Sequence, residues 1–159
     1  MKTDIGLTEA TRNSVAERLN SMLADEYILY TKTRNYHWNV TGPQFSELHQ
    51  FFKEQYEALN DVVDEVAERV RTVGGWPYGT VSEFLKHARL KEQPGRVANP
   101  KAMLANLLAD HEAIVRQLRV DAATLLEEDR DAGTSDFVTA VMEKHEKMAW
   151  MLRAHLEGE

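Results

Sequence analysis

Hydrophobic side chains recur at steps of three and four residues along four long stretches of the chain, which is the spacing of one face of an α-helix. The first stretch predicts a helix from about Thr8 to Asn39. Polar residues share its stripe with hydrophobic ones: Val15, Leu19, Met22, Glu26, Leu29, Thr33 and His37. The second stretch follows Thr41-Gly42-Pro43 and stops at Gly74-Gly75, because proline suits the first turn of a helix and glycine suits its end.

The second half of the chain repeats this layout after a long connection, within which a short helix is expected from about Thr80 to Ala88. Asn99-Pro100 places an N-cap before a proline at the first helical position and begins a helix that runs to about Glu128. Gly133-Thr134 then breaks the chain, and the last helix is expected from about Ser135 to Glu157. The pattern predicts one all-α domain over residues 1–159, a four-helix bundle whose second and third long helices are joined by a crossover.

The amino-acid composition limits which metal ligands, cellular locations and partners are expected. The chain has no cysteine, so any metal must be bound by nitrogen and oxygen. No apolar run approaches the roughly 20 residues of a membrane helix. The segment Met1 to Ala10 lacks the basic and apolar parts of a signal peptide, so we expect a cytoplasmic protein. With 26 acidic and 19 basic side chains, the formal charge of −7 favours cations over nucleic acid as partners.

Candidate chemistry lies on the second helix, beside its apolar stripe. At about 100° per residue, one arc of the helical wheel carries a set of polar residues: His49, Lys53, Asp64 and Glu68. Such an arc is ordinarily a solvated face, but Asp64 and Glu68 lie one turn apart and can hold one hard cation together. His37 ends the first helix where His49 enters the second, so a short loop can bring the two imidazoles together.

The histidine pair and the carboxylate pair cannot meet within one chain. His49 and Asp64 lie on the same helix, separated by about 22 Å at a rise of about 1.5 Å per residue. Two copies packed antiparallel about a two-fold axis would instead place the histidines of one copy against the carboxylates of the other, and the dimer would carry two equivalent sites. Two imidazoles and two carboxylates suit Fe(II) or Zn(II), with positions open for a second ion or an oxidant.

Two segments closely resemble the Dps family, the mini-ferritins named as DNA-binding proteins from starved cells: NYHWNVTGPQFSELHQFF and DVVDEVAERVRTVGG. The resemblance covers nearly the whole chain, including the short helix in the crossover. It implies a ferritin-like bundle, assembled as a hollow homododecamer that oxidises Fe(II), preferentially with hydrogen peroxide, and stores the Fe(III) mineral inside. The positions that match the family's metal ligands form a catalytic and metal-binding set between two subunits: His37, His49, Asp64 and Glu68. Trp38 resembles the family's tryptophan near the site, or is an ordinary packing aromatic.

Two features depart from that family. Members usually have Asp or Glu four residues after the second histidine, where this chain has Lys53, and the neighbouring Glu54 points about 100° away around the helix. One alternative is therefore a shell that sequesters iron or zinc while Lys53 impairs oxidation. The family's lysine-rich terminal tail also has no counterpart here, since Lys2 is the one basic residue before Arg12. DNA binding is not expected without bridging divalent ions, and a nucleoid-associated structural protein is the third hypothesis.

Acidic residues also gather around the turn before the last helix: Asp129, Asp131 and Asp136. They form either a solvated turn that complements the helix N-terminus or, as the resemblance implies, the lining of a three-fold pore that admits iron. Asp136 is the preferred pore residue.

Four histidines lack a convergent ligand pattern, and surface or locally hydrogen-bonded roles are expected for them: His87, His111, His145 and His155. The Met and aromatic residues of the last helix, Trp150 among them, are expected to pack in the core.

Overall fold

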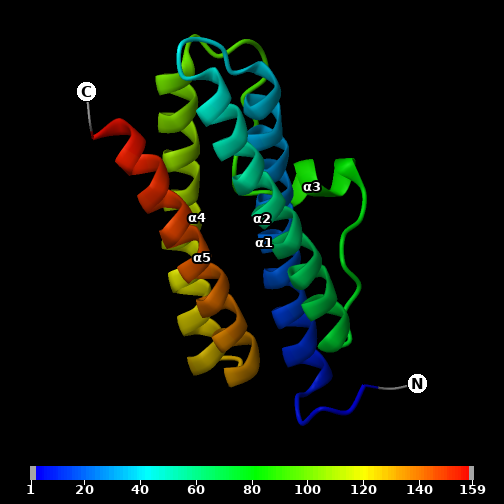
Figure 1. Cartoon of the computed structure of the whole chain (residues 1–159). Coiled ribbons are helices and arrows are strands. Elements are labelled where there is room, and N and C mark those ends of the chain that lie inside the picture. Colours follow the sequence, from blue (N-terminus) through cyan, green and yellow to red (C-terminus); the bar gives the residue numbers. More distant parts are fainter. Residues whose placement is uncertain (1–2, 158–159) are drawn as a thin grey trace.

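The computed structural model describes residues 3–157, and this range contains five helices (Figure 1). Their bounds are as follows: α1 Glu9–Asn39, α2 Phe45–Thr72, α3 Val81–His87, α4 Pro100–Glu127 and α5 Ala132–Leu156. The long helices pair as two hairpins, α1 with α2 and α4 with α5, and α3 packs against α1. The expected all-α bundle, with a short helix between its second and third long helices, is confirmed.

Local capping explains where most of the helices begin. The Thr8 hydroxyl accepts a hydrogen bond from the Thr11 N–H at 3.1 Å and starts α1. Thr80 and Glu83 form a reciprocal capping box at the start of α3. Asn99 accepts from the Ala102 N–H at 2.9 Å in front of the proline that opens α4. These caps satisfy backbone donors that the first turn of a helix leaves without partners.

The last helix begins earlier than the sequence pattern indicated. Asp131 is its N-cap, and the Asp131 carboxylate accepts hydrogen bonds from the backbone N–H of Thr134, at 3.0 Å, and from the Thr134 hydroxyl. A Cβ atom at Gly133 would lie 3.2 Å from Arg69 Nη2, so glycine leaves room for the arginine that hydrogen-bonds Thr134. The segment Gly133-Thr134 is therefore the first turn of α5 rather than a break.

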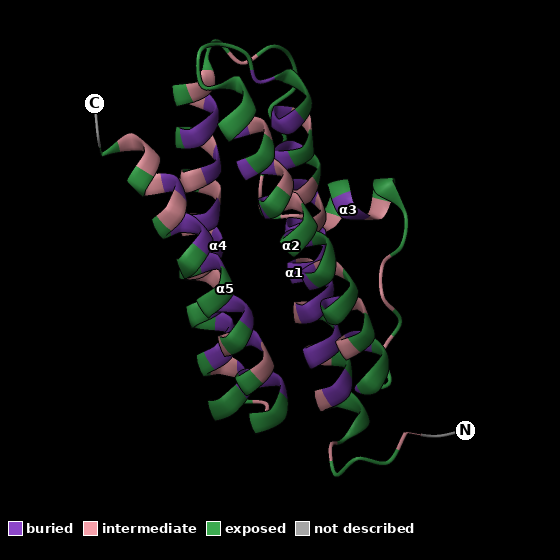
Figure 2. Ribbon diagram, viewed as in Figure 1, coloured by how far each residue is buried: buried purple, intermediate pink, exposed green. Residues whose placement is uncertain are grey.

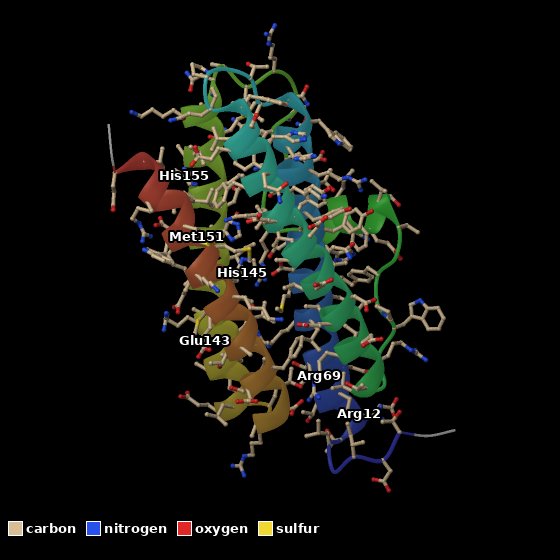
Figure 3. All side chains as sticks on the ribbon, viewed as in Figure 1. Arg12, Arg69, Glu143, His145, Met151 and His155 are labelled. Carbon is tan, nitrogen blue, oxygen red and sulfur yellow. The ribbon has the colours of Figure 1, made fainter. Side chains whose placement is uncertain are left out.

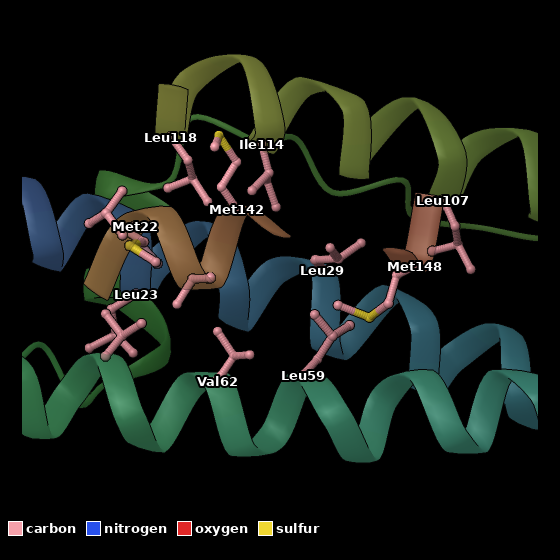
Figure 4. Close-up of a cluster of buried hydrophobic side chains, with 14 of the residues drawn as sticks. Met22, Leu23, Leu29, Leu59, Val62, Leu107, Ile114, Leu118, Met142 and Met148 are labelled. Carbon is pink, nitrogen blue, oxygen red and sulfur yellow. The ribbon is translucent and has the colours of Figure 1, made fainter. Parts of the chain in front are cut away.

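The core lies between the facing sides of the four long helices, where buried positions gather (Figure 2). Every residue of the predicted α1 stripe is buried, the polar ones included. Side chains from all four long helices meet in the close-up of Figure 4: Leu29, Leu59, Ile114 and Met148. Fully burying one such side chain contributes about 1.5–3 kcal/mol. No helix within residues 3–157 is long and apolar enough to cross a lipid bilayer.

Trp150 corrects one expectation about this core. Its side chain is 62% exposed, whereas Met148 and Leu152 on the same helix are buried. A step of two residues along a helix turns the side-chain direction by about 200°. Trp150 lies two residues from both Met148 and Leu152, so its side chain points away from the core. The methionines Met142 and Met148 do pack in the core as expected.

Candidate metal site

His37 in the last turn of α1 and His49 near the start of α2 lie face to face, with ring centroids 3.8 Å apart and planes inclined by 24°. Each ring uses Nδ1 to reach the backbone carbonyl of the other residue, at 2.6 Å from His37 and 2.8 Å from His49. Because a carbonyl oxygen can only accept, each Nδ1 must carry the hydrogen. In the neutral form, each ring with this tautomer has its lone pair at Nε2, which is the nitrogen left available to bind a metal.

Neighbouring aromatic rings fix the orientation of this histidine pair. Tyr56 meets the His37 ring edge-on, with centroids 5.3 Å apart, and Phe45 lies 5.0 Å from the His49 ring. The His37 residue is buried and His49 is half-buried. The short loop thus brings the two imidazoles together as expected and holds them in a defined tautomer before any ligand arrives.

The carboxylates Asp64 and Glu68 lie further along α2 and are exposed. Within the described residues they make no hydrogen bond or ion pair. No group of three or more His, Asp or Glu side chains suited to a metal ion occurs anywhere in residues 3–157. One chain therefore presents two nitrogen ligands at one end of α2 and two free carboxylates nearer the other end.

Lys53 is paired along its own helix. Its Nζ lies 3.7 Å from Glu57 Oε1, and the two side chains are 44% and 55% exposed. An exposed pair of this kind contributes only about 0–1 kcal/mol. Glu57 was not predicted from the sequence as a site residue. It lies one helical turn beyond Lys53 and partly neutralises the lysine's charge near the histidine pair.

Trp38 lies beside His37 in sequence but its side chain is 64% exposed. The Arg34 guanidinium carbon lies 5.3 Å from the Trp38 ring centroid and 5.7 Å from that of Tyr56. Within one chain, Trp38 therefore packs against Arg34, and Arg34 links it to the tyrosine that meets the His37 ring.

The three acidic residues before and within α5 have different environments. Asp129 lies 3.6 Å from Arg18, with a side chain only 11% exposed, and Asp131 is buried as the N-cap of α5. Asp136 is exposed on the second turn of the helix. Two of the three carboxylates are thus engaged inside the subunit, and Asp136 is the one that faces outward.

The structure contradicts the expectation for two of the remaining histidines, His111 and His145. Both residues are 0% exposed and lie in the core (Figure 3 labels His145 midway along α5). Their Nδ1 atoms are 2.9 Å apart, and His145 Nε2 is 2.8 Å from Glu26 Oε1. The expectation of surface or local roles was wrong for these two, because their partners come from other helices. The signal that could have found them is their spacing at one turn from core residues such as Ile114 and Met142.

Two antiparallel hairpins joined by a crossover with a short helix define a ferritin-like bundle, and the ferritin-like domain family matches residues 16–158. The structure is similar to that of DpsC from Streptomyces coelicolor, with a TM-score of 0.94 and 32% identity, covering 100% of this chain and 92% of that one. The DNA protection during starvation protein of Brevibacillus brevis is 37% identical over 157 residues, 99% of this chain and 100% of the relative. An uncharacterised low temperature-induced protein from Nostoc sp. is 49% identical over 158 residues, 99% of this chain and 88% of the relative. The chain belongs to the Dps family.

Proposed function

We propose that this chain is the subunit of a hollow homododecamer that oxidises Fe(II) and stores the Fe(III) mineral inside. Each iron site would lie between two copies: His37 and His49 come from one copy, and Asp64 and Glu68 come from the other. The shell would act in the cytoplasm, with Fe(II) and hydrogen peroxide as its substrates.

The observation that carries this proposal is the reciprocal hydrogen bonding of the two histidines. Both Nδ1–H groups are used by backbone carbonyls, which leaves two Nε2 lone pairs at the start of α2. Imidazole and carboxylate ligands together suit Fe(II). Asp64 and Glu68 are exposed and have no partner among the described residues, so they are free to bind a metal ion together with the histidines of a second copy.

In the proposed reaction each of two Fe(II) ions loses one electron. Hydrogen peroxide takes both electrons and two protons, its O–O bond breaks, and two water molecules form. The protein supplies ligands that position the ions, while the carboxylates favour the more highly charged Fe(III) product. No residue of the chain needs to form a covalent bond.

A sequestering shell with slow oxidation is the second candidate, and Lys53 is the observation that favours it. A cation stands four residues after His49, where a further carboxylate would otherwise help to hold a second iron. Such a shell would bind iron or zinc at the same ligands but turn over poorly.

Stopped-flow oxidation of Fe(II) by hydrogen peroxide distinguishes the two candidates. The unmodified protein should oxidise iron well above the protein-free rate, and His49→Gln should slow it by at least about tenfold, since loss of even a supporting group at a metal site costs this much. His87→Gln is the matched control, because His87 lies on α3 against Tyr78, with ring centroids 4.3 Å apart. A protein that binds iron but does not accelerate its oxidation would support the sequestering shell instead.

Mixing two inactive variants tests whether the site lies between subunits. His49→Gln removes a nitrogen ligand from one copy, and Asp64→Asn removes an oxygen ligand from the other. If the variants are unfolded together, refolded and assembled at random, about a quarter of the sites should combine an intact histidine pair with an intact carboxylate pair. Recovery of about a quarter of the activity is the expected result, and no recovery in a verified mixed assembly would contradict an intersubunit site.

A further inference from the structure

A chain of three polar side chains crosses the middle of the bundle, outside the candidate metal site. The residues are Glu26 of α1, His145 of α5 and His111 of α4, and all three are 0% exposed. His145 stands at the centre, with Nε2 2.8 Å from Glu26 Oε1 and Nδ1 2.9 Å from His111 Nδ1. We call these three residues the core triad. It joins one helix hairpin to the other through hydrogen bonds that water does not reach.

The surroundings of the core triad are apolar. Each member is flanked one turn away by buried hydrophobic residues, several of which are drawn in Figure 4: Met22, Leu29, Leu107, Ile114, Met142 and Met148. On the facing side of α2, Leu59 and Val62 are buried and cannot titrate. The buried polar residue of α2 is Gln55, a neutral amide whose Nε2 donates to the Met148 carbonyl at 3.4 Å.

Charged residues next to the core triad in sequence point elsewhere and are paired. On α4, Asp110 pairs with Lys32 at 2.6 Å and Glu112 with Arg153 at 2.6 Å. On α5, the two charges beside His145 also have outward partners: Lys144 pairs with Glu65, and Glu146 pairs with Arg119. Glu26 is thus the charged group that faces the two buried imidazoles.

The geometry does not suit a single metal ion. Glu26 and His111 contact opposite nitrogens of the His145 ring, so no one ion could contact all three side chains as they stand. The described residues contain no group of three such ligands that could hold an ion. A hydrogen-bonded chain of a carboxylate and two imidazoles is instead an arrangement that holds and relays protons.

Counting protons shows what the core triad tolerates. An Nδ1–Nδ1 hydrogen bond needs a hydrogen on one ring and a lone pair on the other, so His111 and His145 can share at most one added proton while that bond lasts. If a second added proton goes to the other imidazole, two N–H groups point at each other and the hydrogen bond is lost. If the second added proton goes to Glu26 instead, the His145 cation has no negative charge beside it in the core.

We propose that the core triad is an acid-sensitive link between the two hairpins: it holds α1 to α4 and α5 while it carries at most one added proton, and a second proton breaks it. Acid would then loosen each subunit from within, independently of how the subunits assemble or handle iron. The Nε2 atom of His111 and the Oε2 atom of Glu26 have no hydrogen-bond partner among the described residues, so no further group stands ready to stabilise that second proton.

The direction of the pH effect follows from His111. Burial, and then the neighbouring His145, hold the pKa of His111 well below its usual value of 6.5. In the unfolded chain both histidines gain protons as the pH falls through about 6.5. The unfolded state therefore binds more protons than the folded state below this pH, and the equilibrium constant for unfolding should rise by up to about tenfold per pH unit for one excess proton.

Thermal and urea unfolding of the full-length protein between pH 7.5 and 5 test the proposal. His111→Gln keeps an amide that can bond His145 Nδ1 but cannot titrate, so its unfolding constant should rise less steeply than that of the unmodified protein, by up to about tenfold per pH unit below 6.5. His87→Gln, at a histidine that is only partly buried on α3, is the matched control and should keep the full pH dependence. Parallel pH profiles for the unmodified protein and His111→Gln would overturn the proposal.

Hydrogen exchange of the unmodified protein provides a second measurement if His111→Gln does not fold. After correction for the intrinsic pH dependence of exchange, peptides that contain His111 or His145 should lose more protection between pH 7 and 5 than peptides from the first half of α2. Equal losses in all helices would contradict an acid-sensitive link at this place. Stabilisation of the unmodified protein by Zn(II) that persists in His49→Gln but vanishes in His111→Gln would also overturn it, because the core triad would then be a metal site.

Discussion

Replacement of Lys53 by aspartate tests the part of the candidate site that departs from the family pattern. Lys53 follows His49 by four residues, so its side chain lies about one helical turn, or about 6 Å, from a metal bound at the histidine pair. In the structure its ammonium group leans toward Glu57, at 3.7 Å, and remains partly exposed. We expect one well-occupied metal position per site in the unmodified protein, weak occupancy of a second, and faster peroxide-dependent oxidation in Lys53→Asp.

The size of the effect follows from Coulomb's law. A change from +1 to −1 at about 6 Å from a divalent ion alters the interaction energy by about 2.8 kcal/mol in a medium with the dielectric constant of water. This corresponds to about 100-fold in affinity at low salt. At physiological ionic strength, with a screening length of about 8 Å, the change falls to about 1.3 kcal/mol, or about tenfold. The stability cost is smaller, because the like-charge pair that an aspartate would form with Glu57 costs only about 0.2–0.5 kcal/mol on a helix surface.

Calorimetric titration with a redox-inert divalent ion at two salt concentrations measures this change directly, and stopped-flow kinetics measures the oxidation rate. Lys53→Gln changes the charge by half as much and should give about half the shift in binding energy. Arg119→Asp is the matched control, because it makes the same charge change at an exposed ion pair with Glu146 between α4 and α5. Two tight ions per site in the unmodified protein, with no gain in Lys53→Asp, would refute the reasoning and leave Lys53 as a solvated side chain.

Three further predictions concern the assembly and its surface. Because the proposed site needs two copies, sedimentation of the purified protein under mild conditions should show a large closed oligomer, and a result of monomer alone would contradict the intersubunit site. The net charge of −7 per chain predicts no appreciable binding to linear duplex DNA at moderate salt without divalent ions. Tight binding in a mobility-shift assay under these conditions would contradict the expectation that the acidic chain repels DNA phosphates. Asp136→Asn should slow iron uptake at low salt, with a difference that shrinks as salt is added, because Asp136 is exposed; an unchanged rate at low salt would assign it to the helix N-terminus alone.

The sequence predicted the fold well because each long helix carries a regular stripe. The α1 stripe was right at every position from Val15 to His37, since burial follows the period of the helix. The start of α5 was misplaced because Gly133 lies inside a helical turn where Arg69 needs space, and that contact joins residues far apart in the chain. Local pattern determines which face of a helix is buried, but contacts between helices determine details of where a helix begins.

Side-chain chemistry was only partly predictable. The loop between α1 and α2 is short enough to indicate that His37 and His49 meet, but the exchange of Nδ1–H bonds with each other's carbonyl depends on the backbone at both helix ends. The core triad was missed because its members lie on three helices. Glu26 was placed correctly on a buried stripe, yet the register of α4 and α5 against α1 decides whether two histidines reach it. That register is set by packing, which no single helix encodes.

The fold and the candidate site depend on different residues. Family membership therefore predicts the fold of the chain but does not determine the charges at the candidate site. The core of one chain is filled by its own helices, whereas Asp64 and Glu68 are exposed and Lys53 is partly exposed, so that changes at these positions cost the bundle little. Lys53 can therefore occupy a position where the family resemblance implies a carboxylate, while the helices and their caps remain intact. The same substitution would change the charge next to an ion bound at the proposed site, where an energy of about 2.8 kcal/mol alters affinity by about 100-fold. The packing that identifies the family therefore leaves the charge at position 53 free to vary, and with it the metal affinity of the proposed site.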